Sequence, residues 1–157
     1  MNKTYILRKA LTHKATGINV NVVASLAIDA ELIQHKAHFS FKFFGGKHIV
    51  YKLTTEKEIK IIQGIVSFTE TPGVLECGNM ETAIHNRGRS AIYTGLGKAM
   101  VALCCKISLD NGMDGFISFE SKGRLTAYYS RMGAKHLTKT RMYVDALEAK
   151  KLIDQYF

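Results

Sequence analysis

The chain has 157 residues, of which 46% are hydrophobic and 22% are charged, and its formal net charge at pH 7 is +9. This balance excludes a disordered chain and predicts one globular domain over residues 1–157. Basic side chains recur along the whole sequence, so the expected surface favours anionic partners such as a phosphorylated cofactor or a nucleic acid. A basic protein without a charge-dependent function remains an equal alternative on charge alone.

The N-terminal half is expected to consist mainly of strands. The opening MNKTYILRKALTHK carries charge too early for the apolar region of a signal peptide, so we expect a soluble cytoplasmic protein. INVNVVASLAI (18–28) has the composition of a strand, and Asp29 is placed to cap a short helix through Ala37. Further strands, joined by turns at Gly45-Gly46 and Pro72-Gly73, are expected over 39–44, 47–53, 59–68 and 74–84.

The C-terminal half changes to a helical period. From Gly97 the apolar residues repeat along one helical face until Asn111-Gly112 ends the helix. A buried strand (115–119), a helix (122–132), an alternating strand (136–144) and a closing amphipathic helix (145–157) follow. Antiparallel strands followed by alternating strands and helices predict a single α/β (α+β) domain with at least one parallel crossover.

The cysteines and histidines show no metal-binding pattern. Cys77, Cys104 and Cys105 have no CxxC spacing, and the six histidines form no HExxH motif. Cys104 and Cys105 fall within the predicted helix and have no activating neighbour, so we expect packed thiols rather than a nucleophile. The longest apolar run, AMVALCC, is too short to span a bilayer. We therefore expect no metal and no membrane contact.

YTGLGKAM (93–100) is a glycine-rich elbow that leads into the predicted helix. Ala99 follows Gly97-Lys98 where a Walker A loop has Ser or Thr, and Met100 stands where the dinucleotide fingerprint has its third glycine. The free N–H groups of a helix N-terminus bind anions, and glycine lets a phosphate approach the backbone. The stretch therefore indicates either a phosphate cradle of another kind or a purely structural turn.

In this context the elbow and a later helix resemble the GNAT superfamily of N-acetyltransferases. The acyl-CoA loop of that family is Gln/Arg-x-x-Gly-x-Gly/Ala, and Gly95-Leu96-Gly97 matches its second half, with Ile92 at the position of the opening Gln or Arg. The helix signature Tyr-x-x-x-Gly-Phe is matched by Tyr129 to Gly133, with Ala134 replacing Phe. The resemblance covers roughly residues 47–145. Glu81, Ala83 and Asn86 further resemble a little-characterised bacterial subgroup.

The resemblance implies a mixed, mostly antiparallel sheet whose central parallel strands splay apart and are flanked by helices. It also implies acetyl-CoA as co-substrate, with pantetheine entering the gap between the strands near 74–84 and 115–119. The Asn often found near the start of the family's later helix is absent, leaving Ser121 and Lys122 there. The expected cofactor-binding residues are Ala83, Tyr93, Thr94, Gly95, Leu96, Gly97, Lys98, Ser121 and Lys122. Contacts of Arg87 and Arg89 with the cofactor phosphates stay open.

Two residues are candidates for proton transfer. Tyr129 is the candidate acid for the leaving thiolate, and a helical Tyr packed in the core is the alternative. Glu81 is the candidate base, acting directly or through water, and a solvated carboxylate on a strand is the alternative. Strand alternation places Asn79, Glu81 and Ala83 on one face and Glu76 on the other. His85 and Asn86, just beyond the strand, are candidates for substrate binding.

The leading hypothesis is an acyl-CoA-dependent N-acetyltransferase that acts by direct transfer to a small-molecule amine or a peptide terminus. The alternatives are a GNAT toxin that acetylates aminoacyl-tRNA, a non-catalytic domain that senses CoA, and a basic nucleic-acid-binding domain. No known nucleic-acid-binding motif appears, so we expect only weak, non-specific binding of that kind. A homodimer stays open. The acceptor is not readable from the sequence.

Overall fold

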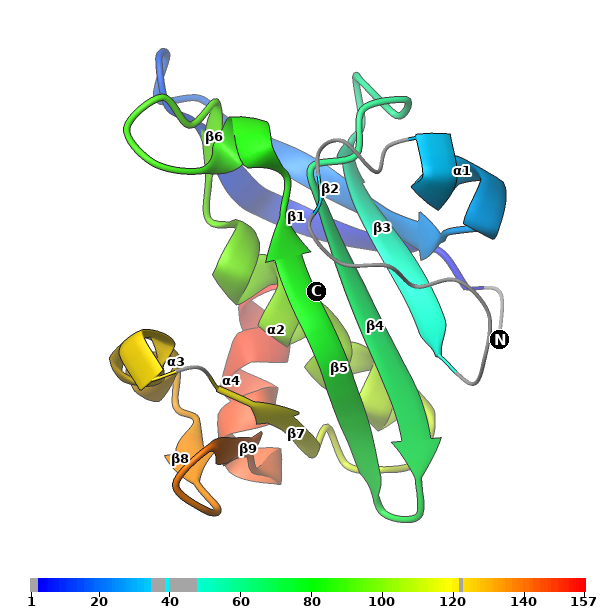
Figure 1. Cartoon of the computed structure of the whole chain (residues 1–157), viewed down its shortest axis with the longest axis vertical. Helices are drawn as coiled ribbons and strands as arrows, with labels where there is room; N and C mark the ends of the chain where they lie inside the picture. Colours follow the sequence, from blue (N-terminus) through cyan, green and yellow to red (C-terminus); the bar gives the residue numbers. More distant parts are fainter. Residues whose placement is uncertain (1–2, 35–38, 40–47, 122) are drawn as a thin grey trace.

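The computed structural model describes residues 3–34, 39, 48–121 and 123–157. Its strands form a single sheet in the order β6-β1-β2-β3-β4-β5-β7-β9-β8 (Figure 1). Their bounds are β1 Tyr5–His13, β2 Asn19–Leu26, β3 Ile49–Thr55, β4 Gly64–Thr71, β5 Val74–Thr82, β6 Tyr93–Thr94, β7 Ile117–Glu120, β8 Lys135–His136 and β9 Arg141–Val144. Every strand pair is antiparallel except β5–β7. The predicted mixed, mostly antiparallel sheet is confirmed.

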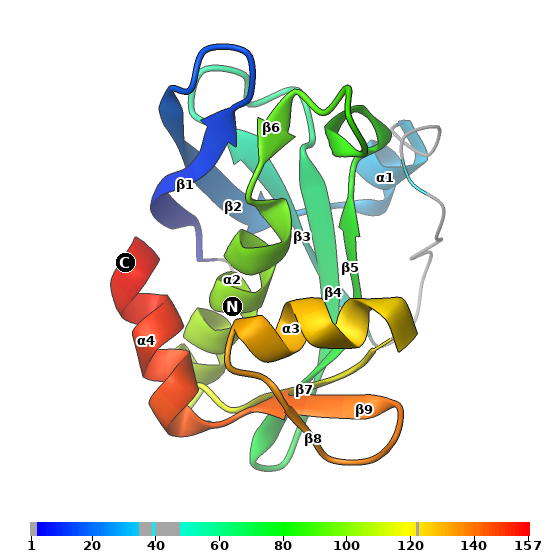
Figure 2. The same ribbon diagram turned by 90° about the vertical axis from the view of Figure 1, so that its left-hand side faces the viewer.

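The helices cover both faces of this sheet. Their bounds are α1 Asp29–Gln34, α2 Leu96–Asp110, α3 Thr126–Arg131 and α4 Ala146–Tyr156. Figure 2 shows α2 and α4 side by side on one face and α1 on the other. The chain crosses from β5 to the parallel strand β7 through α2, which is the predicted crossover.

The main core lies between the sheet and α2. This helix is buried along most of its length, with Ala99, Leu103, Cys104 and Ile107 fully buried. A smaller buried cluster contains Leu32 of α1 together with Val50, Ile62 and Ile65. Strands β3 and β4 thus contribute to both apolar layers, because successive side chains of a strand point to opposite faces.

Several predicted elements differ from the observed ones. Strand β1, which pairs with β2 and β6, was not predicted, because polar and apolar residues there do not alternate regularly. The strand expected over 59–68 begins only at Gly64. The strand expected over 136–144 is a hairpin of two short strands, β8 and β9. The strand predicted over 39–44 and the turn at Gly45-Gly46 lie almost wholly outside the described residues.

Candidate functional site

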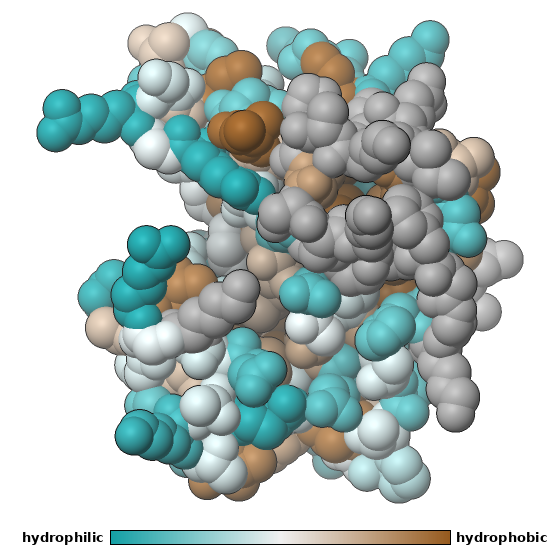
Figure 3. Space-filling model, viewed as in Figure 1, coloured by the Kyte–Doolittle hydropathy of each residue, from teal (hydrophilic) through white to brown (hydrophobic). Residues whose placement is uncertain are grey.

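The central parallel strands separate after a short paired segment. Leu75–Cys77 of β5 pair with Ile117–Phe119 of β7, and β5 then continues to Thr82 without this partner. A cavity of about 550 Å³ opens where the two strands diverge. It is lined by Cys77, Gly78, Asn79, Met80, Glu81, Thr82, Arg87, Phe119, Glu120, Arg124, Leu125 and Tyr129. Figure 3 shows the surface hollowed on this side, between α3 and the segment that carries β6.

A β-bulge redirects the side chains of β5 at this point. Ser67 pairs with Asn79 and Phe68 with Cys77, so Gly78 is the extra residue, and the Asn79 N–H donates to Ser67 Oγ at 3.1 Å. The extra residue shifts the alternation by one position. Glu76 therefore lies on the same face of the sheet as Glu81, and the prediction that the two face opposite ways is wrong. Bulges recur next to active sites, where they re-aim side chains.

Glu81 lies in the cavity wall as one member of an ion pair. Its Oε1 accepts a hydrogen bond from Arg87 Nη2 at 2.7 Å, and its side chain is only 11% exposed. Arg87 Nε donates to the Thr82 carbonyl at 2.8 Å, which anchors the guanidinium to the end of β5. The carboxylate is thus held in a defined position facing the gap between the strands.

Tyr129 enters the same cavity from α3. Its ring packs edge-to-face on Phe119 of β7 with 4.8 Å between the ring centroids. Burial raises the pKa of Tyr129, and the neighbouring groups Tyr128, Cys77 and Cys104 raise it further. The phenol therefore keeps its proton at neutral pH, as a proton donor must. The structure brings Tyr129 and Glu81, the two predicted proton-transfer residues, to one cavity.

The glycine elbow follows β6 and leads directly into α2. Gly95 has φ of 100°, and a Cβ there would lie 2.8 Å from the Ala10 carbonyl oxygen. Both the backbone conformation and the close approach of β1 therefore require glycine at this position. Ala99 is the first residue of the helix whose N–H bonds back, to Gly95 O at 3.1 Å. The N–H groups of Leu96, Gly97 and Lys98 precede this ladder, and N–H groups in this position are the ones that a helix N-terminus can offer to an anion.

The neighbour of Gly97 differs from the expected one. A Cβ at this position would collide with the hydroxyl of Tyr128 and lie 2.9 Å from its Cζ. The side chain missing at Gly97 therefore makes room first for a tyrosine of α3, rather than only for a phosphate.

The other residues expected around the loop have different surroundings. Tyr93 is buried with its ring edge-on to His13, and Leu96 is 3% exposed. Thr94 is exposed and pairs with Thr12 of β1, and Lys98 is half-buried in the first turn of α2. Ser121 is 5% exposed. Lys122 lies outside the described residues.

Three residues predicted near the end of β5 surround Gln63 instead of the cavity. Asn86 donates to Gln63 Oε1 at 2.8 Å and accepts the Tyr93 N–H at 3.0 Å. His85 Nε2 lies 2.9 Å from the same Gln63 oxygen. Ala83 is fully buried, and its N–H donates to the Gln63 carbonyl at 3.0 Å. This network positions the segment before the glycine elbow, and none of the three residues lines the cavity.

Sequence reasoning missed Gln63 and most of the residues that line the cavity. Gln63 is 1% exposed, and its only signal was a polar side chain between the apolar runs of IKIIQGIV. Phe119, Arg124 and Leu125 line the cavity because β7 and the turn just before α3 meet there. Such convergence has no signature in a single sequence.

The cysteines have the properties of packed thiols. A hydrogen bond to Cys104 and burial raise the pKa of the Cys77 thiol, and burial raises that of Cys105. A thiol with a raised pKa is a poor nucleophile at neutral pH. Among the described residues no three His, Cys, Asp or Glu side chains are grouped to hold a metal ion. The described helices are also too short or too polar to cross a lipid bilayer.

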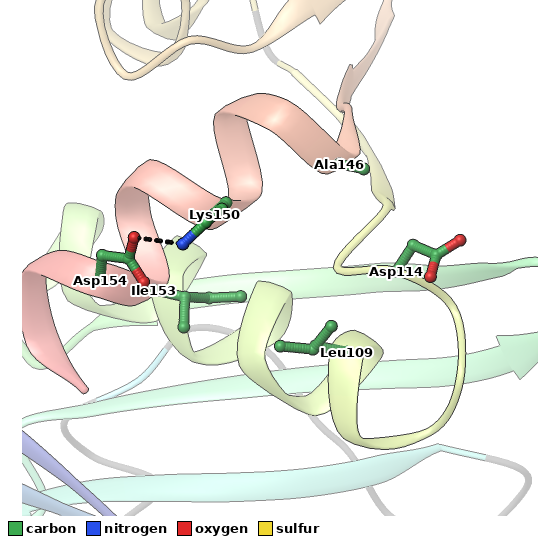
Figure 4. A pocket seen from close by; sticks show the side chains of 6 residues that line it. All are labelled: Leu109, Asp114, Ala146, Lys150, Ile153 and Asp154. Atoms are coloured by element: carbon green, nitrogen blue, oxygen red, sulfur yellow. Dashed lines mark hydrogen bonds and ion pairs between the residues drawn. The ribbon is translucent and has the colours of Figure 1, made fainter.

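A second hollow, of about 360 Å³, lies at the opposite end of α2 (Figure 4). It is lined by Leu109, Asp114, Ala146, Lys150, Ile153 and Asp154. Lys150 and Asp154 form an ion pair with each other at 2.7 Å. None of the predicted site residues reaches this hollow.

No protein-family model matches this sequence, and no curated protein matches it significantly. Solved structures do match. The ribosomal-protein-S18-alanine N-acetyltransferase from Escherichia coli superposes with a TM-score of 0.58 at 12% identity, over 78% of this chain and 92% of that one. An acetyltransferase of the GNAT family from Staphylococcus aureus has a TM-score of 0.56 at 9% identity, over 80% of this chain and 99% of that one.

The chain has the GNAT fold. A third structure of similar shape, AtaTR bound with AcCoA, has a TM-score of 0.57 at 12% identity, over 83% of this chain and 97% of that one. In this fold Glu81 lies on the splayed strand β5 and Tyr129 on α3. Both residues line the cavity that opens where β5 and β7 separate.

Proposed function

We propose that this protein is an acyl-CoA-dependent N-acyltransferase that transfers an acetyl group from acetyl-CoA to an amine by direct attack. The observation that carries the proposal is the cavity at the splay of β5 and β7, with a buried phenol and an ion-paired carboxylate in its walls. One GNAT-fold neighbour is described as bound with AcCoA, which supports the choice of acyl donor.

The residues at the start of α2 fit the cofactor. Acetyl-CoA carries a diphosphate, and three backbone N–H groups at a helix N-terminus with no acidic residue in the first turn suit such an anion. Thr94, Gly95, Leu96, Gly97 and Lys98 would hold the diphosphate, and the gap beside β5 would hold the pantetheine. Bound there, acetyl-CoA supplies an activated thioester.

The side chains of the cavity supply the proton transfers. Glu81 accepts a proton from the attacking amine, directly or through water, while Arg87 holds its carboxylate in place. Tyr129 donates its proton to the departing thiolate, and its raised pKa keeps this proton available at neutral pH. Both groups act on the substrates without a covalent intermediate on the enzyme, consistent with the raised thiol pKa values of Cys77 and Cys105.

The test is calorimetric titration with acetyl-CoA. Lys98→Glu places a negative charge at the proposed diphosphate site, so its dissociation constant for acetyl-CoA should rise about tenfold or more. The same carboxylate suits a helix N-terminus, so the melting temperature should not fall. Lys139→Glu makes the same charge change in the exposed turn between β8 and β9 and should leave binding unaltered.

Absence of acetyl-CoA binding by the wild-type protein would refute the proposal. If binding is observed, thiol release in the presence of a panel of small amines, peptides and aminoacyl-tRNA identifies the acceptor class. Binding without thiol release from any of these amines would favour the CoA-sensing alternative.

A further inference from the structure

Gln63 lies directly before β4, and the sheet holds its backbone in place. It is 1% exposed, and its N–H donates to the Leu53 carbonyl of β3 at 2.8 Å. Its carbonyl accepts the N–H of Ala83, the residue that follows β5, at 3.0 Å. The side chain of Gln63 therefore extends from a backbone that is bonded to β3 and to the end of β5.

The hydrogen-bond roles around this side chain follow from one backbone group. The Tyr93 N–H can only donate, so Asn86 presents Oδ1 to it at 3.0 Å and turns Nδ2 toward Gln63. Asn86 Nδ2 donates to Gln63 Oε1 at 2.8 Å. The same oxygen lies 2.9 Å from His85 Nε2, so this ring nitrogen carries the proton and donates as well. One side-chain oxygen thus accepts hydrogen bonds from both Asn86 and His85.

The short helical turn Ile84–Asn86, which this oxygen holds, leads to the candidate base. Arg87 is the next residue along the chain, and its Nη2 donates to Glu81 Oε1 at 2.7 Å. Gln63 therefore fixes the turn from which the Glu81 ion pair is anchored.

The same turn also holds the segment before the glycine elbow. The His85 carbonyl accepts the Ile92 N–H at 3.0 Å, and Asn86 Oδ1 accepts the N–H of the following Tyr93. Tyr93 is two residues before Gly95, the capping position of α2. The elbow is thus attached to the turn from the side opposite Gln63.

We propose that Gln63 is a positioning residue that fixes the acyl-CoA elbow and the Glu81 carboxylate relative to each other; the proposal rests on the function inferred above. Direct transfer requires the amine and the thioester carbon to meet at about 3–3.5 Å. Glu81 orients the amine from β5, whereas the elbow orients the cofactor from β6 and α2. Because the turn between them is held by one Gln63 oxygen, loss of this acceptor should weaken cofactor binding and lower turnover together.

Gln63→Met keeps a long unbranched side chain and removes both acceptor bonds. The dissociation constant for acetyl-CoA, measured by calorimetry, should rise about three- to tenfold, and turnover should fall on the order of tenfold. Gln63→Glu keeps an acceptor oxygen for Asn86 and His85, so both quantities should return close to their wild-type values. Wild-type affinity and turnover in Gln63→Met, or equal losses in Gln63→Glu, would overturn the proposal.

Ser108→Ala is the matched control for a loss of stability alone. Ser108 is fully buried, and its Oγ donates to the Phe116 carbonyl at 2.7 Å at the other end of α2. The substitution should lower the melting temperature, as Gln63→Met does, and leave acetyl-CoA affinity and turnover unaltered. Equal losses of affinity and turnover in both variants would overturn the proposal, because reduced stability would then explain them.

Double-mutant cycles separate the two attachments of the turn. In an Asn86→Ala background the bond to Tyr93 is already absent, so Gln63→Met should add little further loss of acetyl-CoA affinity. In an Arg87→Met background Glu81 has lost this anchor, so Gln63→Met should add a smaller loss of turnover at saturating acetyl-CoA than it does in wild type. Full additivity in both cycles would overturn the proposal.

Hydrogen exchange of the ligand-free protein tests the network without the cofactor. The Tyr93 amide should exchange about tenfold faster in Gln63→Met than in wild type or Gln63→Glu. The His13 amide, which donates to the Ile18 carbonyl at 2.8 Å, should not change. Unchanged exchange at Tyr93 would overturn the positioning role, whereas a wild-type protein that binds no acetyl-CoA fails the proposed function itself.

Discussion

The two ends of helix α2 are built in opposite ways. At the C-terminal end, Ser108 Oγ donates to the Phe116 carbonyl at 2.7 Å. Asp110 there accepts hydrogen bonds from Lys3 at 2.8 Å and Tyr5 at 3.0 Å, and it pairs with Lys106 at 3.2 Å. At the N-terminal end, Gly95 provides no side-chain cap, and the first turn holds no acidic residue.

The two ends of α2 therefore contribute differently: the C-terminal end to the stability of the fold, and the N-terminal end to the proposed binding of an anion. Backbone N–H groups of the turn that follows satisfy the last carbonyls of α2, as the Met113 N–H does by donating to the Ser108 carbonyl at 2.9 Å. Lys3 and Tyr5 bind the side chain of Asp110 at this end.

At the N-terminal end, the N–H groups of Leu96, Gly97 and Lys98 precede the helical ladder, and the ring of Tyr128 lies beside Gly97. A helix end left without its own cap is less stable but is available to an anion. Substitutions at the two ends should therefore have different effects.

The largest expected effect is on turnover. Tyr129→Phe removes the proposed proton donor and should lower turnover on the order of a hundredfold, while acetyl-CoA binding stays nearly unchanged. Tyr5→Phe, at the other end of α2, should lower stability and leave turnover intact. Steady-state kinetics and thermal melting of both variants measure the contrast. Equal activity of Tyr129→Phe and wild type would remove Tyr129 from the mechanism.

A smaller effect is expected on stability at the C-terminal end. Asp110→Asn weakens the bonds to Lys3, Tyr5 and Lys106 and should lower the free energy of unfolding by about 1–2 kcal/mol. Asp154→Asn breaks an exposed ion pair with Lys150 and should cost less than about 0.5 kcal/mol. Urea denaturation measures both. A loss of acetyl-CoA affinity in Asp110→Asn would contradict the separation of the two ends.

The smallest effect is a pH dependence at the same residue. Burial alone would raise the pKa of Asp110, but hydrogen bonds from Lys3, Lys106 and Tyr5 lower it overall. A carboxyl with a lowered folded-state pKa stabilises the protein fully above its unfolded value of about 4, and this stabilisation is lost as the pH falls through the folded value. The urea midpoint should therefore drop less between pH 7 and pH 3 in Asp110→Asn than in wild type. Equal drops would show that Asp110 does not contribute.

Local chemistry made several elements predictable. Pro72-Gly73 marked the hairpin between β4 and β5, where Gly73 has φ of 80°. Asn111-Gly112 marked the end of α2, and the closing amphipathic helix begins after Asp145, whose side chain accepts the Glu148 N–H. Each of these signals depends on a few consecutive residues, so neighbouring sequence contains all the information.

The errors fall where pairing between distant segments decides the outcome. The bulge at Gly78 exists because two residues of β5 oppose one position of β4, and this register is set by the whole strand pair. The turn that splits 136–144 is likewise visible only once β9 pairs with β7 on one side and with β8 on the other. The alternation of residues along one strand predicts neither the bulge at Gly78 nor the turn between β8 and β9.

By itself the sequence determined the order of most elements and the glycine elbow before α2, because periodicity and motif spacing are properties of consecutive residues. The two residues proposed for proton transfer were chosen through the resemblance to the GNAT superfamily. The tertiary structure alone decided that Gly78 turns Glu76 to the face of Glu81, that Gln63 gathers Ala83, His85 and Asn86, and that Tyr128 covers Gly97. These contacts join residues of different elements, and only packing brings such elements together.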